Sequence, residues 1–122
     1  MKEAATPKPL VWMGSSRKDF AGFPDDVKSE VGYALFLAQC GDRHRRTKTL
    51  SGFGGAGVVE MVSYHRGDTF RTVYTVRVGS AVYVLHAFQK KSKRGVATPQ
   101  IDMSLVERRL REAEQLARGD EK

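Results

Sequence analysis

The chain has 122 residues, a formal net charge of +7 at pH 7 and a sequence pI near 9.8. This length suits one domain with its own hydrophobic core, and the 40% of hydrophobic residues excludes a disordered basic tail. The single cysteine, Cys40, excludes a disulfide framework and a cysteine metal site, and no apolar run reaches the ~18 residues of a membrane span.

The predicted elements begin with a short strand at residues 10–12, directly after two prolines. A helical turn is expected over residues 15–23. A longer helix then starts at Pro24, because proline suits the first helical position and the two aspartates that follow favour a helix N-terminus. Its apolar positions recur at helical spacing until Gly41 ends it: Val27, Val31, Ala34, Leu35 and Ala38.

A loop of basic residues and glycines, 43–57, leads into three alternating segments at 58–64, 69–78 and 81–88. Valine, tyrosine and phenylalanine dominate these segments and short turns separate them, so they predict an antiparallel meander. A last helix is expected to begin at Thr98 and Pro99 or at Asp102. Its predicted apolar face consists of Leu105, Val106, Leu110, Ala113 and Leu116.

This order of elements predicts an α+β fold. Its antiparallel sheet, one N-terminal strand plus the meander, packs against the N-terminal helices, and a C-terminal helix follows. We expect a single domain over residues 1–122, with flexible ends at 1–8 and 117–122. The N-terminus lacks the apolar core of a signal peptide, which favours a cytoplasmic protein.

A sheet of this kind buries one face under helices and leaves the other face open. In the middle strand Arg71 and Arg77 share a face, so both are predicted to mark the open side. In the last strand Val84, His86 and Phe88 share a parity that continues to Lys90. The alternation therefore predicts that His86 and Lys90 lie beside Arg71.

Positive charge is concentrated in one part of the chain. Residues 43–94 contain eleven Lys or Arg but only two acids, Glu60 and Asp68, while the rest of the chain holds ten basic and twelve acidic residues. A coat that only kept the protein soluble would spread its charges more evenly. The clustering indicates a polyanionic partner.

Three motifs carry a resemblance to a known family. They are SGFGGAGVVEM from Ser51, the Phe70-Arg71 pair that enters a strand, and YVLHAFQKKSKRG from Tyr83. Together with the Thr-Pro and amphipathic helix that follow, they resemble the HigB-like branch of the RelE/ParE toxins. The resemblance spans about residues 12–116, and its most specific part is LHAFQKKS, because glycine-rich loops are common.

The resemblance implies a RelE-like fold and the toxin of a type II toxin-antitoxin system. Such toxins are commonly endoribonucleases that cut mRNA at the ribosome, by attack of the 2′-hydroxyl on the neighbouring phosphate. It implies a cognate antitoxin, often a HigA-like helix-turn-helix protein, and requires no cofactor or metal. Some relatives act on DNA gyrase instead, and a non-catalytic nucleic-acid-binding module is a further alternative.

The resemblance also implies site residues. Arg71 matches the family's strand arginine and is expected to hold the scissile phosphate, although an ion pair with Glu60 is an equal alternative. Lys90 matches a basic position just beyond the last strand. His86 suits proton transfer, but a histidine in an apolar strand is more often a satisfied core residue. Further cations are expected to follow the RNA backbone: Arg45, Arg46, Lys48, Lys91, Lys93 and Arg94.

One position departs from the family pattern. Relatives often carry a basic residue two positions after the strand glutamate, where this chain has Val62. The substitution removes one expected phosphate contact and is compatible with an attenuated or repurposed toxin.

Overall fold

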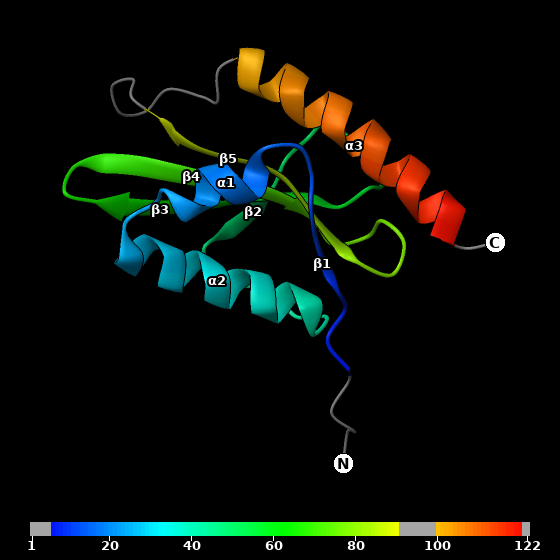
Figure 1. Ribbon diagram of the computed structural model, residues 1–122, viewed down its shortest axis with the longest axis horizontal. Helices are drawn as coiled ribbons and strands as arrows, with labels where there is room; N and C mark the ends of the chain where they lie inside the picture. The colour runs from blue at the N-terminus through cyan, green and yellow to red at the C-terminus, as the bar shows by residue number, and fades with distance from the viewer. Residues whose placement is uncertain (1–5, 91–99, 121–122) are drawn as a thin grey trace.

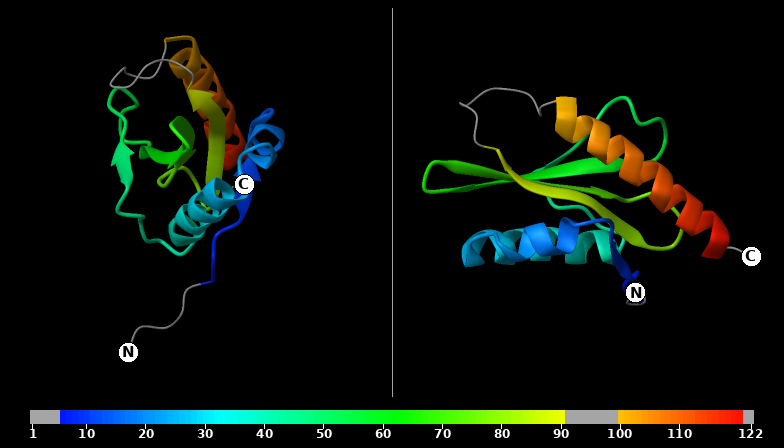
Figure 2. Two further views of the ribbon diagram at one scale, coloured as in Figure 1. Left: turned by 90° about the vertical axis from the view of Figure 1, so that its left-hand side faces the viewer. Right: turned by 45° about the horizontal axis from the view of Figure 1, so that its top comes forward.

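The computed structural model describes residues 6–90 and 100–120. The described elements are β1 (Leu10–Trp12), α1 (Ser16–Ala21), α2 (Asp25–Gln39), β2 (Thr47–Thr49), β3 (Val58–His65), β4 (Asp68–Thr75), β5 (Val82–Lys90) and α3 (Gln100–Asp120). They form an α+β fold of three layers, in which α1 and α2 lie below a single sheet and α3 crosses above it (Figures 1 and 2).

The sheet has five strands in the order β1-β5-β4-β3-β2. The antiparallel meander of β3, β4 and β5 is confirmed. Two features differ from the prediction: β1 pairs with β5 in parallel, and β2 adds an edge strand inside the segment expected to be a loop. A three-residue strand of sequence Thr-Lys-Thr is too short to show a period of two, so its partner β3 defines it.

Helices cover both faces of the sheet, whereas the sequence predicted one buried face. On the α2 face, a helix–sheet core joins Val27, Val31 and Leu35 of α2 to Val59, Met61, Phe70, Tyr74 and Val84 of the strands. On the α3 face, a second core joins Val106, Leu110, Ala113 and Ala117 to Val58, Val73, Tyr83 and Leu85. Each fully buried aliphatic side chain contributes about 1.5–3 kcal/mol.

A β-bulge in β5 decides which side chains reach the α3 face. Val73 pairs with His86, but the next residue, Tyr74, pairs with Val84, so Leu85 is an extra residue in β5. Leu85 and His86 therefore lie on the same face, while Val84 belongs to the opposite core. The predicted grouping of Val84 with His86 was wrong, because an unbroken alternation cannot account for the inserted residue.

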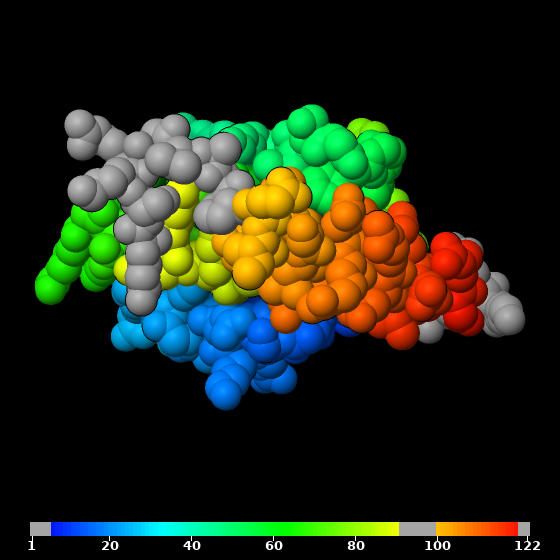
Figure 3. All heavy atoms as spheres, turned by 90° about the horizontal axis from the view of Figure 1, so that it is seen from above, coloured from blue at the N-terminus to red at the C-terminus, as the bar shows by residue number. Residues whose placement is uncertain are grey.

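The α3 helix lies along β5 and leaves part of the upper face uncovered by any described helix. Figure 3 shows α3 crossing this face, with β5 in yellow beside its N-terminal half. Its buried positions include Ala117, whereas Leu116, predicted to be buried, is 49% exposed. The predicted start at Thr98 and Pro99 lies outside the described residues, and the helix reaches Asp120.

Two pairs of hydrogen bonds join segments that are distant in sequence. The Lys8 N–H donates to the carbonyl of Gln39 at 2.8 Å, and the Gln39 amide donates to the Lys8 carbonyl at 2.7 Å. In α3, the buried guanidinium of Arg109 donates to the carbonyl of Leu85 at 2.9 Å and to the hydroxyl of Ser15 at 3.2 Å. Burial lowers the pKa of Arg109. Arg109 thus joins α3 to the bulge and to the start of α1.

In the part of the chain that the structure describes, every helix is too short or too polar to cross a membrane.

Candidate nucleic-acid interface

Four charged side chains from four adjacent strands meet on the face of the sheet that α3 packs against. We call Lys48 (β2), Glu60 (β3), Arg71 (β4) and Lys90 (β5) the Glu60 cluster. Strand pairing explains their proximity, because Lys48 pairs directly with Glu60. In β4, Arg71 lies two residues from Val73, the partner of Glu60, and two residues from Thr69, the partner of Lys90. The predicted placement of Lys90 near Arg71 on one face is therefore found in the structure.

Glu60 lies at the centre of the cluster. Its side chain is 0% exposed, and Oε1 accepts a hydrogen bond from Arg71 Nη1 at 2.8 Å. The ammonium of Lys48 lies 3.7 Å from the same oxygen and is 66% exposed. A buried carboxylate is tolerated only when it is paired, so this geometry explains why Glu60 needs the neighbouring cations.

The charges of the cluster do not balance. Counted over the described residues, three cations lie near one carboxylate, a formal excess of two positive charges at a single place on the sheet. Lys90 is 7% exposed, and burial lowers its pKa, as do the nearby charges of Arg71 and Lys48, while Glu60 acts in the opposite direction. The surroundings therefore disfavour the charged form of Lys90, and a bound anion would relieve this repulsion.

The guanidinium of Arg71 retains hydrogen-bonding capacity. Its side chain is 13% exposed, and Nε is buried with no hydrogen-bond partner among the residues that the structure describes. Glu60 holds one edge of the guanidinium group through Nη1, and the buried Nε edge can receive another acceptor once the side chains that cover it shift. An arginine that is oriented in this way is suited to bind a phosphate through two parallel hydrogen bonds.

His86 is on the same face but has a different partner. Its Nε2 lies 2.7 Å from Oδ1 of Asp102 in the first turn of α3, and its ring stacks on Phe88 with centroids 4.5 Å apart. Phe88 is in turn the β4 pairing partner of Arg71. The other ring nitrogen, Nδ1, is buried and without a hydrogen-bond partner in residues 6–90 and 100–120. The imidazole is thus oriented by α3. It lies next to the Arg71–Phe88 pair, because His86 pairs with Val73, two residues along β4 from Arg71.

The remaining predicted RNA-binding residues lie apart from the cluster or are not among the described residues. Arg46 pairs with Glu30 of α2 at 3.1 Å, and Arg45 is exposed in the preceding turn. Arg77 follows the end of β4, six residues beyond Arg71, and so does not share its site. Lys91, Lys93 and Arg94 lie outside the described residues.

Val62 takes the place of the expected basic residue and faces the cluster directly. It pairs with Arg71 across β3 and β4 and is half-buried. Next along the same face, the aromatic ring of Tyr64 is 69% exposed. The cluster is therefore bordered by apolar and aromatic side chains against which a nucleotide base can pack.

Sequence reasoning missed two residues that shape this region. Asp102 was considered only as a helix start, and Arg109 was not singled out among the basic residues of the last helix. A signal for Asp102 existed in the acidic residue placed in a first helical turn, but nothing local connects it to a histidine sixteen positions earlier. Within the described ranges, no group of three or more His, Cys, Asp or Glu is arranged to hold a metal ion.

Comparisons with known proteins relate the chain to a family and to a solved structure. The family profile described as "Phage derived protein Gp49-like (DUF891)" matches residues 18–111. No curated protein sequence matches the chain. Among solved structures, the toxin-antitoxin complex RelBE2 from Mycobacterium tuberculosis aligns at 19% identity with a TM-score of 0.45, covering 75% of this chain and 100% of that chain.

Proposed function

The chain belongs to the phage-derived Gp49-like family, and from this membership and the Glu60 cluster we propose that it is the toxin of a type II toxin-antitoxin system. We propose further that it is a HigB-like, ribosome-dependent endoribonuclease that acts on mRNA in the cytoplasm. The observation that carries the proposal is the excess of positive charge around one buried carboxylate. The LHAFQKKS motif, which contributes Lys90 to that cluster, supports it.

Arg71 binds the scissile phosphate in this mechanism. Glu60 fixes the guanidinium through Nη1, and the Nε edge donates to the non-bridging oxygens. Because the fork is held before substrate arrives, little reorganisation is needed as negative charge develops on the phosphoryl group. Lys48 contributes a second, more exposed positive charge on the same side.

Lys90 and His86 move the protons. His86 Nε2 is hydrogen-bonded to Asp102, so Nδ1 is the nitrogen that accepts the proton of the 2′-hydroxyl; the side chains that bury it must shift when RNA binds. The 2′-oxygen attacks phosphorus, the bond to the 5′-oxygen breaks, and Lys90 protonates that oxygen. A lowered pKa makes Lys90 a better proton donor than an ordinary lysine. The products are a 2′,3′-cyclic phosphate and a 5′-hydroxyl.

The proposal includes a partner. A HigA-like, helix-turn-helix antitoxin is expected to neutralise the toxin by covering the Glu60 cluster or by keeping the protein away from the ribosome. Because the cluster is positively charged, an acidic segment of the antitoxin would be favoured at this place.

The decisive experiment is primer extension on an mRNA incubated with the purified protein, with and without translating ribosomes. New 5′ ends that appear only with ribosomes, and that disappear in Arg71→Lys, support the proposal. No new ends from a protein shown to be folded would refute the endoribonuclease mechanism. DNA damage with intact transcripts would then indicate a gyrase-directed toxin, and salt-sensitive RNA binding without cleavage a binding module.

A further inference from the structure

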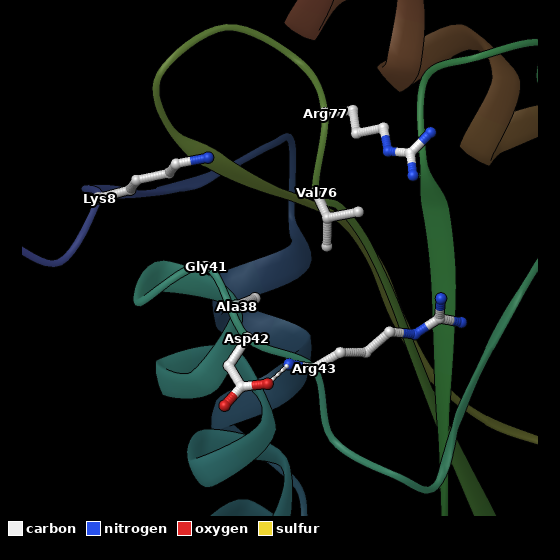
Figure 4. A pocket seen from close by; sticks show the side chains of 7 residues that line it. All are labelled: Lys8, Ala38, Gly41, Asp42, Arg43, Val76 and Arg77. Carbon is white, nitrogen blue, oxygen red and sulfur yellow. Dashed lines mark hydrogen bonds between the residues drawn. The ribbon is translucent and has the colours of Figure 1, made fainter. Parts of the chain in front are cut away.

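A second group of cations lies at the opposite end of β4, around a cavity that the mechanism above does not use. The cavity has a volume of about 280 Å³. Its charged lining is Lys8, Asp42, Arg43 and Arg77, and Ala38 and Val76 form its apolar floor (Figure 4). We call it the Arg77 pocket. Since strands rise about 3.3 Å per residue, the six positions between Arg71 and Arg77 separate the two sites by roughly 20 Å.

The pocket carries uncompensated positive charge. Asp42 is its one carboxylate, and Oδ1 of that residue accepts the backbone N–H of Arg43 at 2.8 Å. Over the described residues, none of the three cations forms an ion pair with an acid; Arg43 Nε donates instead to the hydroxyl of Thr47 at 2.9 Å. The free carbonyls of the α2 end are already partly satisfied, because the N–H groups of Gly41 and Asp42 donate back to Ala38 and Leu37.

Two of the cations belong to segments of the chain that are tied to their neighbours. Lys8 is hydrogen-bonded to Gln39 in both directions. Arg77 packs against Gly57, where a Cβ atom would come within 2.9 Å of its Cγ. Figure 4 shows the guanidinium groups of Arg43 and Arg77 extended toward the same strand, with Lys8 on the other side of the pocket.

We propose that the Arg77 pocket binds a second phosphate of the same RNA strand, remote from the scissile one. The proposal rests on the proposed function. The planar guanidinium groups of Arg43 and Arg77 suit the oxygens of a phosphodiester, and Lys8 adds positive charge from the other side of the cavity. The edge strand β2 links the two sites: Lys48 belongs to the Glu60 cluster, while its neighbour Thr47 points to the other face and holds Arg43. An RNA strand that crosses this edge meets both sites in turn.

The test measures binding of a 2′-O-methylated RNA oligonucleotide, which cannot be cleaved, by fluorescence anisotropy over a range of salt concentrations. Arg77→Gln and Lys8→Gln are each expected to weaken binding several-fold and to reduce the slope of log K against log salt by about 0.7, the contribution of one phosphate contact to a single strand. Arg17→Gln is the matched control, because Arg17 is exposed on α1, outside both sites.

Slopes for the pocket variants that equal the slope for Arg17→Gln would overturn the proposal. An NMR titration with inorganic phosphate separates the two possible sources of the anion. Shifts at Gly41 and Arg77 with free phosphate, combined with unchanged RNA slopes, would mean that the pocket binds a free phosphate and would also overturn it. Failure of the proposed function is visible separately, as absence of mRNA cleavage by the wild-type protein while the slope comparison still holds.

Discussion

At the scale of single residues, the pairing of Arg71 with Glu60 combines a structural and a functional role. Arg71 donates the 2.8 Å hydrogen bond that compensates a fully buried carboxylate, and its buried Nε has no hydrogen-bond partner among the described residues. The two alternatives considered from the sequence, an ion pair or a phosphate contact, are therefore compatible in geometry. A variant that removes the charge tests both roles at once, so the substitution has to be chosen with care.

We expect Arg71→Ala to destabilise the fold by about 3–5 kcal/mol, because Glu60 would remain buried without its main partner. Arg71→Lys keeps a cation near Glu60 and should cost less than about 2 kcal/mol. Both variants lose the guanidinium fork, and cleavage should fall by at least ~10²-fold. Urea unfolding and primer extension measure the two effects. Full cleavage by Arg71→Lys would show that the fork is not required.

Tyr74 gives a prediction about pH. Burial raises the pKa of Tyr74 to about 12 from an ordinary value of 10.0. Between these values the unfolded chain ionises Tyr74 and the folded chain does not, so its contribution to stability is complete below pH 10 and is lost as the pH rises to about 12. The loss amounts to about 3 kcal/mol, since two pKa units at about 1.4 kcal/mol each are involved.

In Tyr74→Phe this alkaline loss should be absent. Urea unfolding of both proteins at pH 8 and pH 11 cancels the contributions of all other titrating groups, since these are common to the two chains. Between pH 8 and pH 11 the wild type should lose about 1 kcal/mol of unfolding free energy relative to the variant. At pH 11 the shift acts over one pKa unit, which corresponds to about 1.4 kcal/mol. An identical difference at both pH values would show that Tyr74 ionises as easily in the folded chain.

At the scale of elements, the connection between β1 and α1 is fitted closely to α3. Gly14 has a φ of 54°, and a Cβ atom at this position would lie 2.6 Å from Nε of the buried Arg109. Gly41, at the end of α2, also has a positive φ, 83°, but a Cβ there would meet nothing within 4 Å. A substitution at Gly41 therefore tests backbone strain alone, whereas a substitution at Gly14 adds a steric overlap.

We expect Gly41→Ala to cost about 1–2 kcal/mol, the strain of a left-handed residue with a side chain. Gly14→Ala should cost a further 1–3 kcal/mol or so, because Arg109 has to move. Thermal or urea unfolding of both variants measures the difference. In an Arg109→Ala background the excess cost at Gly14 should disappear; equal costs of the two glycine substitutions in the wild type would contradict the tight contact.

The elements also show which parts of the fold are readable from the sequence. The strands of the meander and the helix α2 were predicted because long segments show a clear period of two or of about four. The edge strand β2 and the bulge at Leu85 were not, because each depends on the pairing of strands that are distant in sequence. The buried face of α3 was assigned one residue away, at Leu116 in place of Ala117, because composition favours leucine over alanine in a core.

The candidate site was readable in part for the same reason. Side-chain parity along β3, β4 and β5 brought Glu60, Arg71 and Lys90 together, and the structure places them on one face. The partner of His86 was not readable, because the contact with Asp102 joins a strand to a helix in a geometry that only the tertiary fold defines. What these residues do chemically stays a prediction that the experiments above decide.

At the scale of the whole molecule, the two cores lie on opposite faces of the same strands. Alternate residues of β4 and β5 supply Tyr74 and Val84 to the α2 core, and Val73 and Leu85 to the α3 core. Neither core can lose its packing without disturbing the strands that form the other. Such sharing favours a single cooperative unfolding transition.

Fluorescence of Trp12, which packs against the α2 core, and far-ultraviolet circular dichroism of the whole chain should therefore give coincident urea transitions. A probe on the other side, such as a fluorophore attached at the exposed Leu116 position of α3, should follow the same curve. If α3 detached at a lower urea concentration than the signal of Trp12 changed, the two layers would be energetically separate.

The bulge at Leu85 reverses the alternation of side chains between the two faces of the sheet. Before the bulge, Val82 and Val84 of β5 face the α2 core. After it, the alternation is reversed, so that His86, Phe88 and Lys90 lie on the α3 face, where Lys90 joins the Glu60 cluster. One inserted residue thus changes which face the alternate side chains of this strand occupy. Without that residue, Lys90 would point toward the α2 core instead of joining Glu60 and Arg71.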